Sequence, residues 1–130
     1  MKGEPSNQPR PGGALQRFLQ GFVYAGKGIC SFVRSERNAR FHCLAIAVVT
    51  AAGFYFGISR GEWIAVVLCF GMVLAAEGFN SAIERLVNLV SPGRNSLAGD
   101  IKDVAAGAVL VCAIAAAVVG LIIFLPYLLP

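Results

Sequence analysis

WIAVVLCFGMVLAAEGFNSAIERLVNLV, at residues 63–90, is the run from which the fold of this chain can be inferred. Its first half carries no charged residue, and the whole run is long enough for a helix that crosses a bilayer. Trp63 lies at its start, where aromatic side chains anchor spans at the membrane interface. The residues that follow, Ser91-Pro92-Gly93, form a strong helix terminator. We therefore expect a transmembrane helix here.

Two further apolar runs flank this one, at residues 41–58 and 104–126. Hydrophobic residues make up 57% of the 130-residue chain, against roughly 45–50% in soluble domains. The short polar turn at residues 59–62 is expected to join the first two spans as a hairpin. The sequence thus predicts an all-α integral membrane fold, with one domain over residues 14–130 and spans near 41–58, 63–90 and 104–126.

The N-terminal region contains two different parts. Residues 1–13 are rich in Pro, Gly and polar side chains, which is typical of a disordered tail. In residues 14–34 apolar side chains such as Phe18 and Phe22 recur at helical spacing, and polar ones fall on the opposite side. This pattern predicts an amphipathic helix that lies on the membrane surface.

Positive charge is distributed unevenly along the chain. Lys and Arg concentrate before residue 41 and again at residues 85–102, only Arg60 lies in the turn between them, and none follows Lys102. The positive-inside rule then places the N-terminus and the second connection in the cytoplasm. The net charge of +4 needs no nucleic acid partner, because a basic cytoplasmic face also attracts anionic lipid.

The cysteines show neither a close pair nor a metal-binding spacing, and His42 is the only histidine. We interpret the cysteines as small buried hydrophobic residues and predict neither a disulfide framework nor a structural metal. They are Cys30, Cys43, Cys69 and Cys112.

Polar side chains interrupt the second span at helical spacing. Glu77, Asn80, Glu84 and Asn88 follow one another at intervals of three or four residues, so they project from one face of the helix. An ionisable group inside a span costs at least about 2.5 kcal/mol, so it is seldom kept without a partner, an ion or a water-filled site. This stripe is the candidate functional site.

Two readings of the stripe are open. In one, Glu77 and Glu84 pair with Arg85, Arg94 or a neighbouring subunit, and the amides hold helices together. In the other, the carboxylates bind Mg²⁺, which is commonly held by one or two carboxylates plus substrate phosphates. Glu77 lies about 10 Å deeper than Glu84 at 1.5 Å per residue, so it is the candidate general base that deprotonates an alcohol.

Other charged residues add to the cytoplasmic side of this site. Lys102 and Asp103 open the third span, where a lysine and the exposed N–H groups of a helix start can bind phosphate, although both residues are also ordinary at a helix start. Glu36 is a possible third acid. Arg17 and Tyr24 share the polar face of the surface helix, and arginine is well suited to phosphate.

Three segments carry a resemblance to a known family: ERNAR at residues 36–40, AEGFNSAIE at 76–84 and AGDIKDVAAGAV at 98–109. Over residues 14–126 the chain resembles the prokaryotic diacylglycerol kinase and undecaprenol kinase family. The resemblance implies a homotrimer in the bacterial inner membrane, with a surface helix and three spans per chain and active sites shared between subunits. It also implies transfer of the γ-phosphate of ATP to the hydroxyl of a membrane lipid, with Mg²⁺ as cofactor.

The resemblance also implies roles for individual residues. Glu77 matches the general base of the family, and Asn80 matches a positioning residue beside it. We therefore expect both residues to act in catalysis. Glu36 and Glu84 match Mg²⁺ ligands. The positions that match nucleotide contacts are Arg17, Tyr24, Lys102 and Asp103. The positions that match lipid contacts are Glu77, Arg40 and Ala106.

The chain departs from the family pattern at Asn88, where an Asp is common, and at residues 93–95, where Gly-Arg-Asn replaces a Glu-Tyr-His stretch that contacts the nucleotide base. Residues 36–42 and 89–92, together with Ala106 and Gly120, are more similar to the undecaprenol kinase branch. We therefore expect undecaprenol as the lipid, with diacylglycerol as the alternative and phosphatidic acid as its product. A hypothesis of another class is a non-catalytic membrane assembly or channel subunit.

Overall fold

The structure is a computed structural model that describes residues 12–129, and it is helical. Its four helices are α1 (Ala14–Ser35), α2 (Arg37–Phe56), α3 (Arg60–Val90) and α4 (Ser96–Leu128). The all-helical expectation is confirmed for this part of the chain. The predicted disordered tail at residues 1–13 falls almost wholly on residues 1–11, outside the described residues.

The chain divides into two compact units, Met1–Ser31 and Phe32–Pro130. The first unit contains most of α1, whose rings Phe18 and Phe22 meet edge to face with centroids 5.2 Å apart. Helix α1 buries none of its residues within the chain. Because a helix gains most of its stability from packing an apolar face, α1 needs a surface beyond its own unit, and its membrane location stays a prediction.

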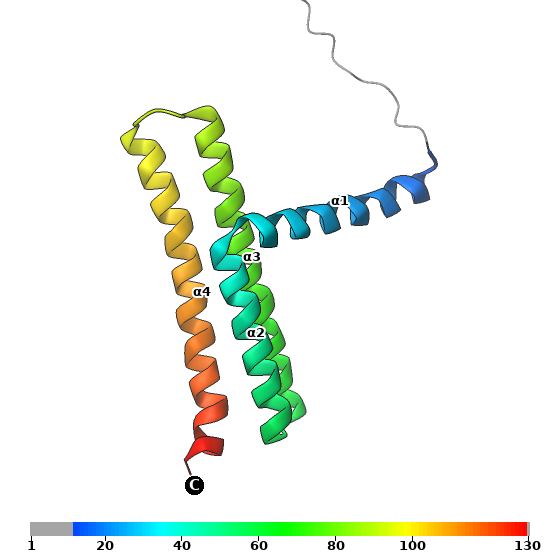
Figure 1. Cartoon of the computed structure of the whole chain (residues 1–130), viewed down its shortest axis with the longest axis vertical. Helices are drawn as coiled ribbons and strands as arrows, with labels where there is room; N and C mark the ends of the chain where they lie inside the picture. The colour runs from blue at the N-terminus through cyan, green and yellow to red at the C-terminus, as the bar shows by residue number, and fades with distance from the viewer. Residues whose placement is uncertain (1–11, 130) are drawn as a thin grey trace, which may run out of the picture. The chain divides into compact units, whose positions relative to one another are not determined.

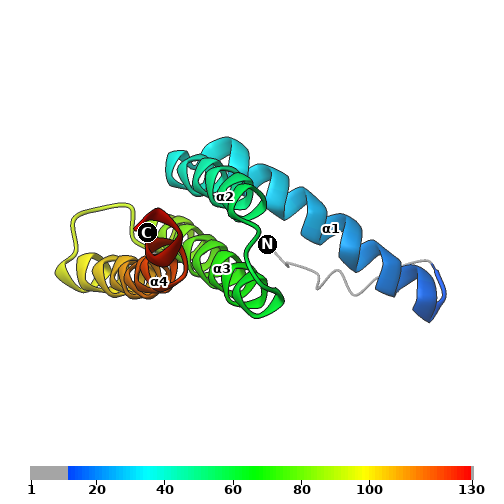
Figure 2. The same cartoon turned by 90° about the horizontal axis from the view of Figure 1, so that it is seen from below.

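The second unit contains α2, α3 and α4, which run side by side (Figures 1 and 2). All three are long and apolar enough to cross a membrane. This confirms the number of apolar helices, whereas their bounds differ from the expected spans. Helix α4 begins at Ser96 rather than near residue 104, because Asn95 caps it: its Oδ1 accepts hydrogen bonds from the backbone N of Leu97 (2.9 Å) and Ala98 (3.3 Å).

The turn between α2 and α3 is fixed by its own sequence. Gly57 ends α2 in the left-handed region (φ 63°), which glycine adopts without steric cost. Ser59 begins α3 with a capping box: its Oγ accepts from the Glu62 N–H (3.3 Å), and Glu62 Oε2 accepts from the Ser59 N–H (2.7 Å). The hairpin expected from the polar turn is present.

The core of this unit lies near the same turn, where Ile58, Val66 and Ile123 are buried together. Aromatic rings of α2, α3 and α4 surround it, and the Tyr127 hydroxyl donates to Glu62 Oε2 (3.0 Å). That bond ties the end of α4 to the start of α3. The end of the bundle with the α2–α3 turn is therefore closed by both apolar and polar contacts.

Helix α3 is the most enclosed of the three. In its apolar 18-residue segment 28% of the residues are buried within the chain, against 11% in the corresponding segment of α2 and 6% in that of α4. The outer faces of the bundle carry many exposed large apolar side chains. Such a surface needs lipid or further protein chains around it.

The four cysteines are free within the described residues. Cys43, Cys69 and Cys112 are half-buried and Cys30 is exposed on α1, so none of the four is fully buried within this chain, contrary to the expectation.

A close approach between α2 and α3 gives a test of the hairpin. A Cβ added at Gly53 would lie 2.7 Å from Trp63 Cη2 and 2.8 Å from Cζ2. We predict that Gly53→Ala destabilises the protein by about 1–3 kcal/mol, because such overpacking moves the ring or the helix. Thermal unfolding of the detergent-solubilised protein measures this. Gly61→Ala is the control, since a Cβ there meets nothing within 4 Å; equal melting of the two variants would contradict the packing.

Candidate active site

The deepest polar side chains of the bundle lie together on α3. Glu77 is only 3% exposed, Ser81 3% and Asn80 9%. They are the buried polar residues among residues 12–129, and the helix around them is apolar. The structure therefore places the predicted base and its neighbouring amide in the interior of this unit.

Asn80 has a buried atom without a partner. Its side-chain Oδ1 makes no hydrogen bond within the described part of the chain. A buried oxygen acceptor without a donor costs free energy, so such an atom calls for an explanation. A cation or a hydrogen-bond donor of a bound molecule would satisfy it.

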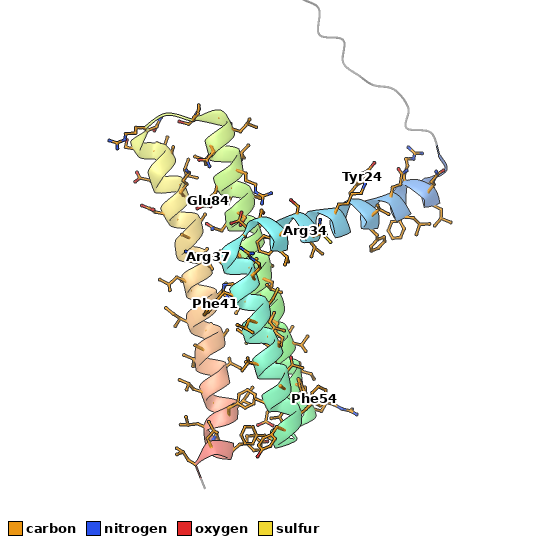
Figure 3. All side chains as sticks on the ribbon, in the orientation of Figure 1. Tyr24, Arg34, Arg37, Phe41, Phe54 and Glu84 are labelled. Atoms are coloured by element: carbon orange, nitrogen blue, oxygen red, sulfur yellow. The ribbon has the colours of Figure 1, made fainter. Side chains whose placement is uncertain are left out.

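Glu84 lies one turn beyond Asn80 and is half-buried. It is on the half of α3 nearer the α3–α4 loop (Figure 3). The stripe thus runs from an enclosed acid, Glu77, to a half-buried acid, Glu84.

Glu36 stands at the N-cap position of α2 and is the second half-buried acid at this level. Its Oε1 lies 3.3 Å from Arg85 Nη2, and the same Nη2 donates to Ser35 Oγ. This is the one ion pair among residues 12–129. The alternative in which Arg85 neutralises Glu77 or Glu84 is therefore wrong for the described residues, because Arg85 faces Glu36 instead.

Lys102 is half-buried at the start of α4 and donates from Nζ to Asn88 Oδ1 (2.6 Å). The bond joins α3 to α4 beside their connecting loop. A cavity of about 460 Å³ at this loop is lined in part by Asn88, Arg94, Asn95 and Lys102. Two cations, a helix start and open volume suit an anionic ligand.

An apolar cavity of about 280 Å³ lies between α2, α3 and α4. Its lining includes His42 on α2 and Val73 on α3, and Val73 precedes Glu77 by one helical turn. Small side chains such as Ala116 and Gly120 line it from α4. Apolar space thus begins close to the deepest acid.

The remaining predicted site residues are not drawn into these contacts. Asp103 and Ala106 are exposed on α4, and Arg40 is exposed on α2. Arg17 and Tyr24 belong to the first unit, where the Lys27 ammonium lies 5.9 Å from the centre of the Tyr24 ring. The roles of all five stay predictions.

The oxygen atoms available at this site suit Mg²⁺ that is bound together with a ligand better than a metal ion held by protein side chains alone. Within residues 12–129 no three His, Cys, Asp or Glu side chains are grouped as metal ligands. Mg²⁺ does not need such a group, because it keeps waters and is shared with phosphates. The carboxylates of Glu36 and Glu84 and the unpartnered oxygen of Asn80 fit that chemistry.

The sequence named Arg85 only as one candidate partner of Glu77 and Glu84, not of Glu36, and it included Ser81 only as part of a motif. Both continue the four-residue spacing from Glu77, which places Ser81 and Arg85 on the same side of α3. That spacing was the available signal. Asn88 was noted as a departure from a family pattern, and the structure adds its hydrogen bond to Lys102.

The unpartnered oxygen of Asn80 has a measurable consequence. We predict that Asn80→Ala does not lower the melting temperature of the ligand-free protein, because the lost side chain leaves no partner unsatisfied. Val73→Ala, two turns deeper and 8% exposed, should destabilise by about 1–3 kcal/mol. Thermal unfolding without nucleotide compares the two, and a larger loss for Asn80→Ala would show that the amide is structural.

Comparison with known proteins gives consistent matches along most of the chain. The sequence profile of the family described as prokaryotic diacylglycerol kinase matches residues 23–124. An undecaprenol kinase of Bacillus subtilis is 43% identical over 114 residues, 88% of this chain and 93% of that protein. A diacylglycerol kinase of Synechocystis is 40% identical over 114 residues, 85% of this chain and 64% of that protein. A diacylglycerol kinase of Haemophilus influenzae is 27% identical over 108 residues, 83% of this chain and 89% of that protein.

Proposed function

Because the chain belongs to the prokaryotic diacylglycerol kinase family and is a lipid kinase, we propose that it transfers the γ-phosphate of ATP to the hydroxyl of a membrane lipid, with Mg²⁺ as cofactor. One observation carries the site assignment: Glu77 is buried beside Asn80, whose oxygen has no partner within the described residues. A buried carboxylate next to a buried oxygen that has no hydrogen-bond partner is an arrangement that a bound ligand or ion would satisfy.

In the proposed reaction Glu77 is the general base. Its carboxylate accepts the proton of the lipid hydroxyl while that oxygen attacks the γ-phosphorus, and ADP leaves with the former bridging oxygen. Phosphoryl transfer depends mainly on positioning and charge stabilisation, so no covalent enzyme intermediate is needed. Asn80 orients the reacting groups from the next turn of α3.

Glu36 and Glu84 are the proposed Mg²⁺ ligands. When bound, Mg²⁺ neutralises charge on the phosphates. Both carboxylates are half-buried, so they remain open to a soluble nucleotide while Glu77 remains enclosed. The separation of half-buried acids from an enclosed acid supports one site that takes both a polar nucleotide and an apolar lipid.

Nucleotide contacts are proposed for Lys102, Asp103, Arg17 and Tyr24. The cavity of about 460 Å³ at the α3–α4 loop supports this proposal for Lys102, which lines it together with the start of α4. Lys102 is held by the neutral Asn88, so its positive charge is not cancelled by that partner.

The lipid is proposed to be undecaprenol. The 43% identity to the undecaprenol kinase of Bacillus subtilis, over nearly all of that protein, supports it. Arg40 and Ala106 are proposed lipid contacts, together with Glu77. Diacylglycerol is the alternative, supported by the relative at 40% identity.

The assembly is proposed to be a homotrimer in the bacterial inner membrane with a cytoplasmic N-terminus. The largely exposed apolar faces of α2 and α4 support association with lipid and further copies. The exposed positions of Asp103, Arg40 and Ala106 also support sites completed by a neighbouring subunit. The hypothesis of a non-catalytic subunit loses its support, since the matched relatives are kinases.

The role of Glu77 has a direct test. We predict that Glu77→Gln lowers kcat at least about a hundredfold, because the amide has nearly the same shape but cannot accept the proton. Radiolabelled ATP with lipid in mixed micelles measures the rate. Glu62→Gln, at the opposite end of α3, is the control and should keep wild-type activity; full activity of Glu77→Gln would remove the base from the mechanism.

The lipid assignment has a separate test. We predict that purified protein phosphorylates undecaprenol with a kcat/KM at least about tenfold above that for diacylglycerol, a ratio equivalent to about 1.4 kcal/mol in the transition state. Both lipids are compared in the same micelles at equal MgATP. A reversed preference would transfer the assignment to diacylglycerol and leave the kinase mechanism unchanged.

A further inference from the structure

Arg85 contacts one of the two proposed Mg²⁺ ligands. Its Nη2 lies 3.3 Å from Glu36 Oε1 and also donates to Ser35 Oγ, at the junction of α1 and α2. The Arg85 side chain is 51% exposed and that of Glu36 28%. A single guanidinium nitrogen therefore joins the last third of α3 to the start of α2.

The position of Glu36 leaves its carboxylate free of its own helix. The short side chains preferred at the N-cap accept a hydrogen bond from a backbone N–H of their helix, which a longer glutamate need not do. Glu36 makes no such capping bond in α2. Its carboxylate instead faces Arg85, the residue next to Glu84 on α3. The ion pair thus directs the acid away from its own helix and toward the helix that carries the other proposed ligand.

The same contact places a positive charge where a cation would bind. An oxygen that faces a guanidinium is not free for Mg²⁺, and two cations at one carboxylate repel each other. An ion pair that is half exposed is weak, so a divalent cation can displace it. The pair is strong enough to orient Glu36 and weak enough to open.

We propose that Arg85 is a positioning residue that holds Glu36 toward α3 in the nucleotide-free protein and competes with the divalent cation for its carboxylate. This rests on the proposed function, in which Glu36 is a Mg²⁺ ligand. Arg85 sets the cation concentration at which the site fills. Its release on filling also frees a guanidinium beside Glu84.

The test measures Mn²⁺ binding to the nucleotide-free, detergent-solubilised full chain by electron paramagnetic resonance. We expect Arg85→Gln to lower the Kd for Mn²⁺ about two- to fivefold, the range that a partly exposed ion pair can supply. Arg85→Lys, which keeps a cation, should stay near the wild-type Kd. In the kinase assay the Mg²⁺ concentration for half-maximal rate should fall by a similar factor in Arg85→Gln.

Two further variants separate competition from general electrostatics. Arg94→Gln removes the same charge from the α3–α4 loop, so a Kd that falls equally in Arg94→Gln and Arg85→Gln overturns the proposal. In a Glu36→Gln background the Arg85→Gln effect should vanish, and its persistence also overturns the proposal. An unchanged or raised Kd in Arg85→Gln does the same.

Failure of this inference is distinguishable from failure of the proposed function. If Glu36→Gln weakens Mn²⁺ binding but Arg85→Gln has no effect, Glu36 remains a ligand and only the competition is wrong. If Glu36→Gln leaves Mn²⁺ binding unchanged, the metal assignment of Glu36 is wrong, and the inference falls with it.

Discussion

The burial of Glu77 in an apolar helix is the constraint on which the rest of this structure depends. The carboxylate of a residue that is only 3% exposed loses most of its contact with water, which costs free energy unless other polar partners replace that contact. Asn80 and Ser81 are buried on the same stretch of α3, so further polar groups lie near this acid. The helix must therefore serve as a membrane span and as the carrier of a polar stripe.

The two ends of the bundle divide these tasks. At the α2–α3 turn the chain closes on itself with a glycine C-cap, a capping box, an aromatic cluster and the Glu62–Tyr127 bond. The half of the bundle nearer the α3–α4 loop has a partly exposed ion pair, and at the loop itself lie one bond between Lys102 and Asn88 and an open cavity. Contacts that fix the fold thus gather near the α2–α3 turn, and the exposed groups that can meet a ligand lie nearer the other end, so ligand groups can move without loosening the core.

Sequence predicted the elements well where hydrophobic length decides them, as in α2, α3 and α4. The start of α4 was predicted too late, because the charged residues that follow Asn95 were excluded from the apolar span. The helix in fact begins directly after Asn95, which caps it. Helical spacing also placed Glu77, Asn80 and Glu84 on one stripe. It could not assign Arg85 to Glu36, since that pairing depends on where α2 begins relative to α3, which no local pattern contains.

The incomplete burial of the stripe bears on the assembly. Glu77 and Asn80 are enclosed by their own chain, whereas Glu84, Asp103 and Ala106 remain open or half-open. In the proposed reaction the transferred phosphate must be shielded from water, or hydrolysis competes with the lipid hydroxyl. Within residues 12–129 nothing covers Asp103 or Ala106, and the apolar outer faces of the bundle need lipid or further protein chains around them. A neighbouring copy would satisfy both needs with one interface, which is the physical argument for an active site shared between subunits.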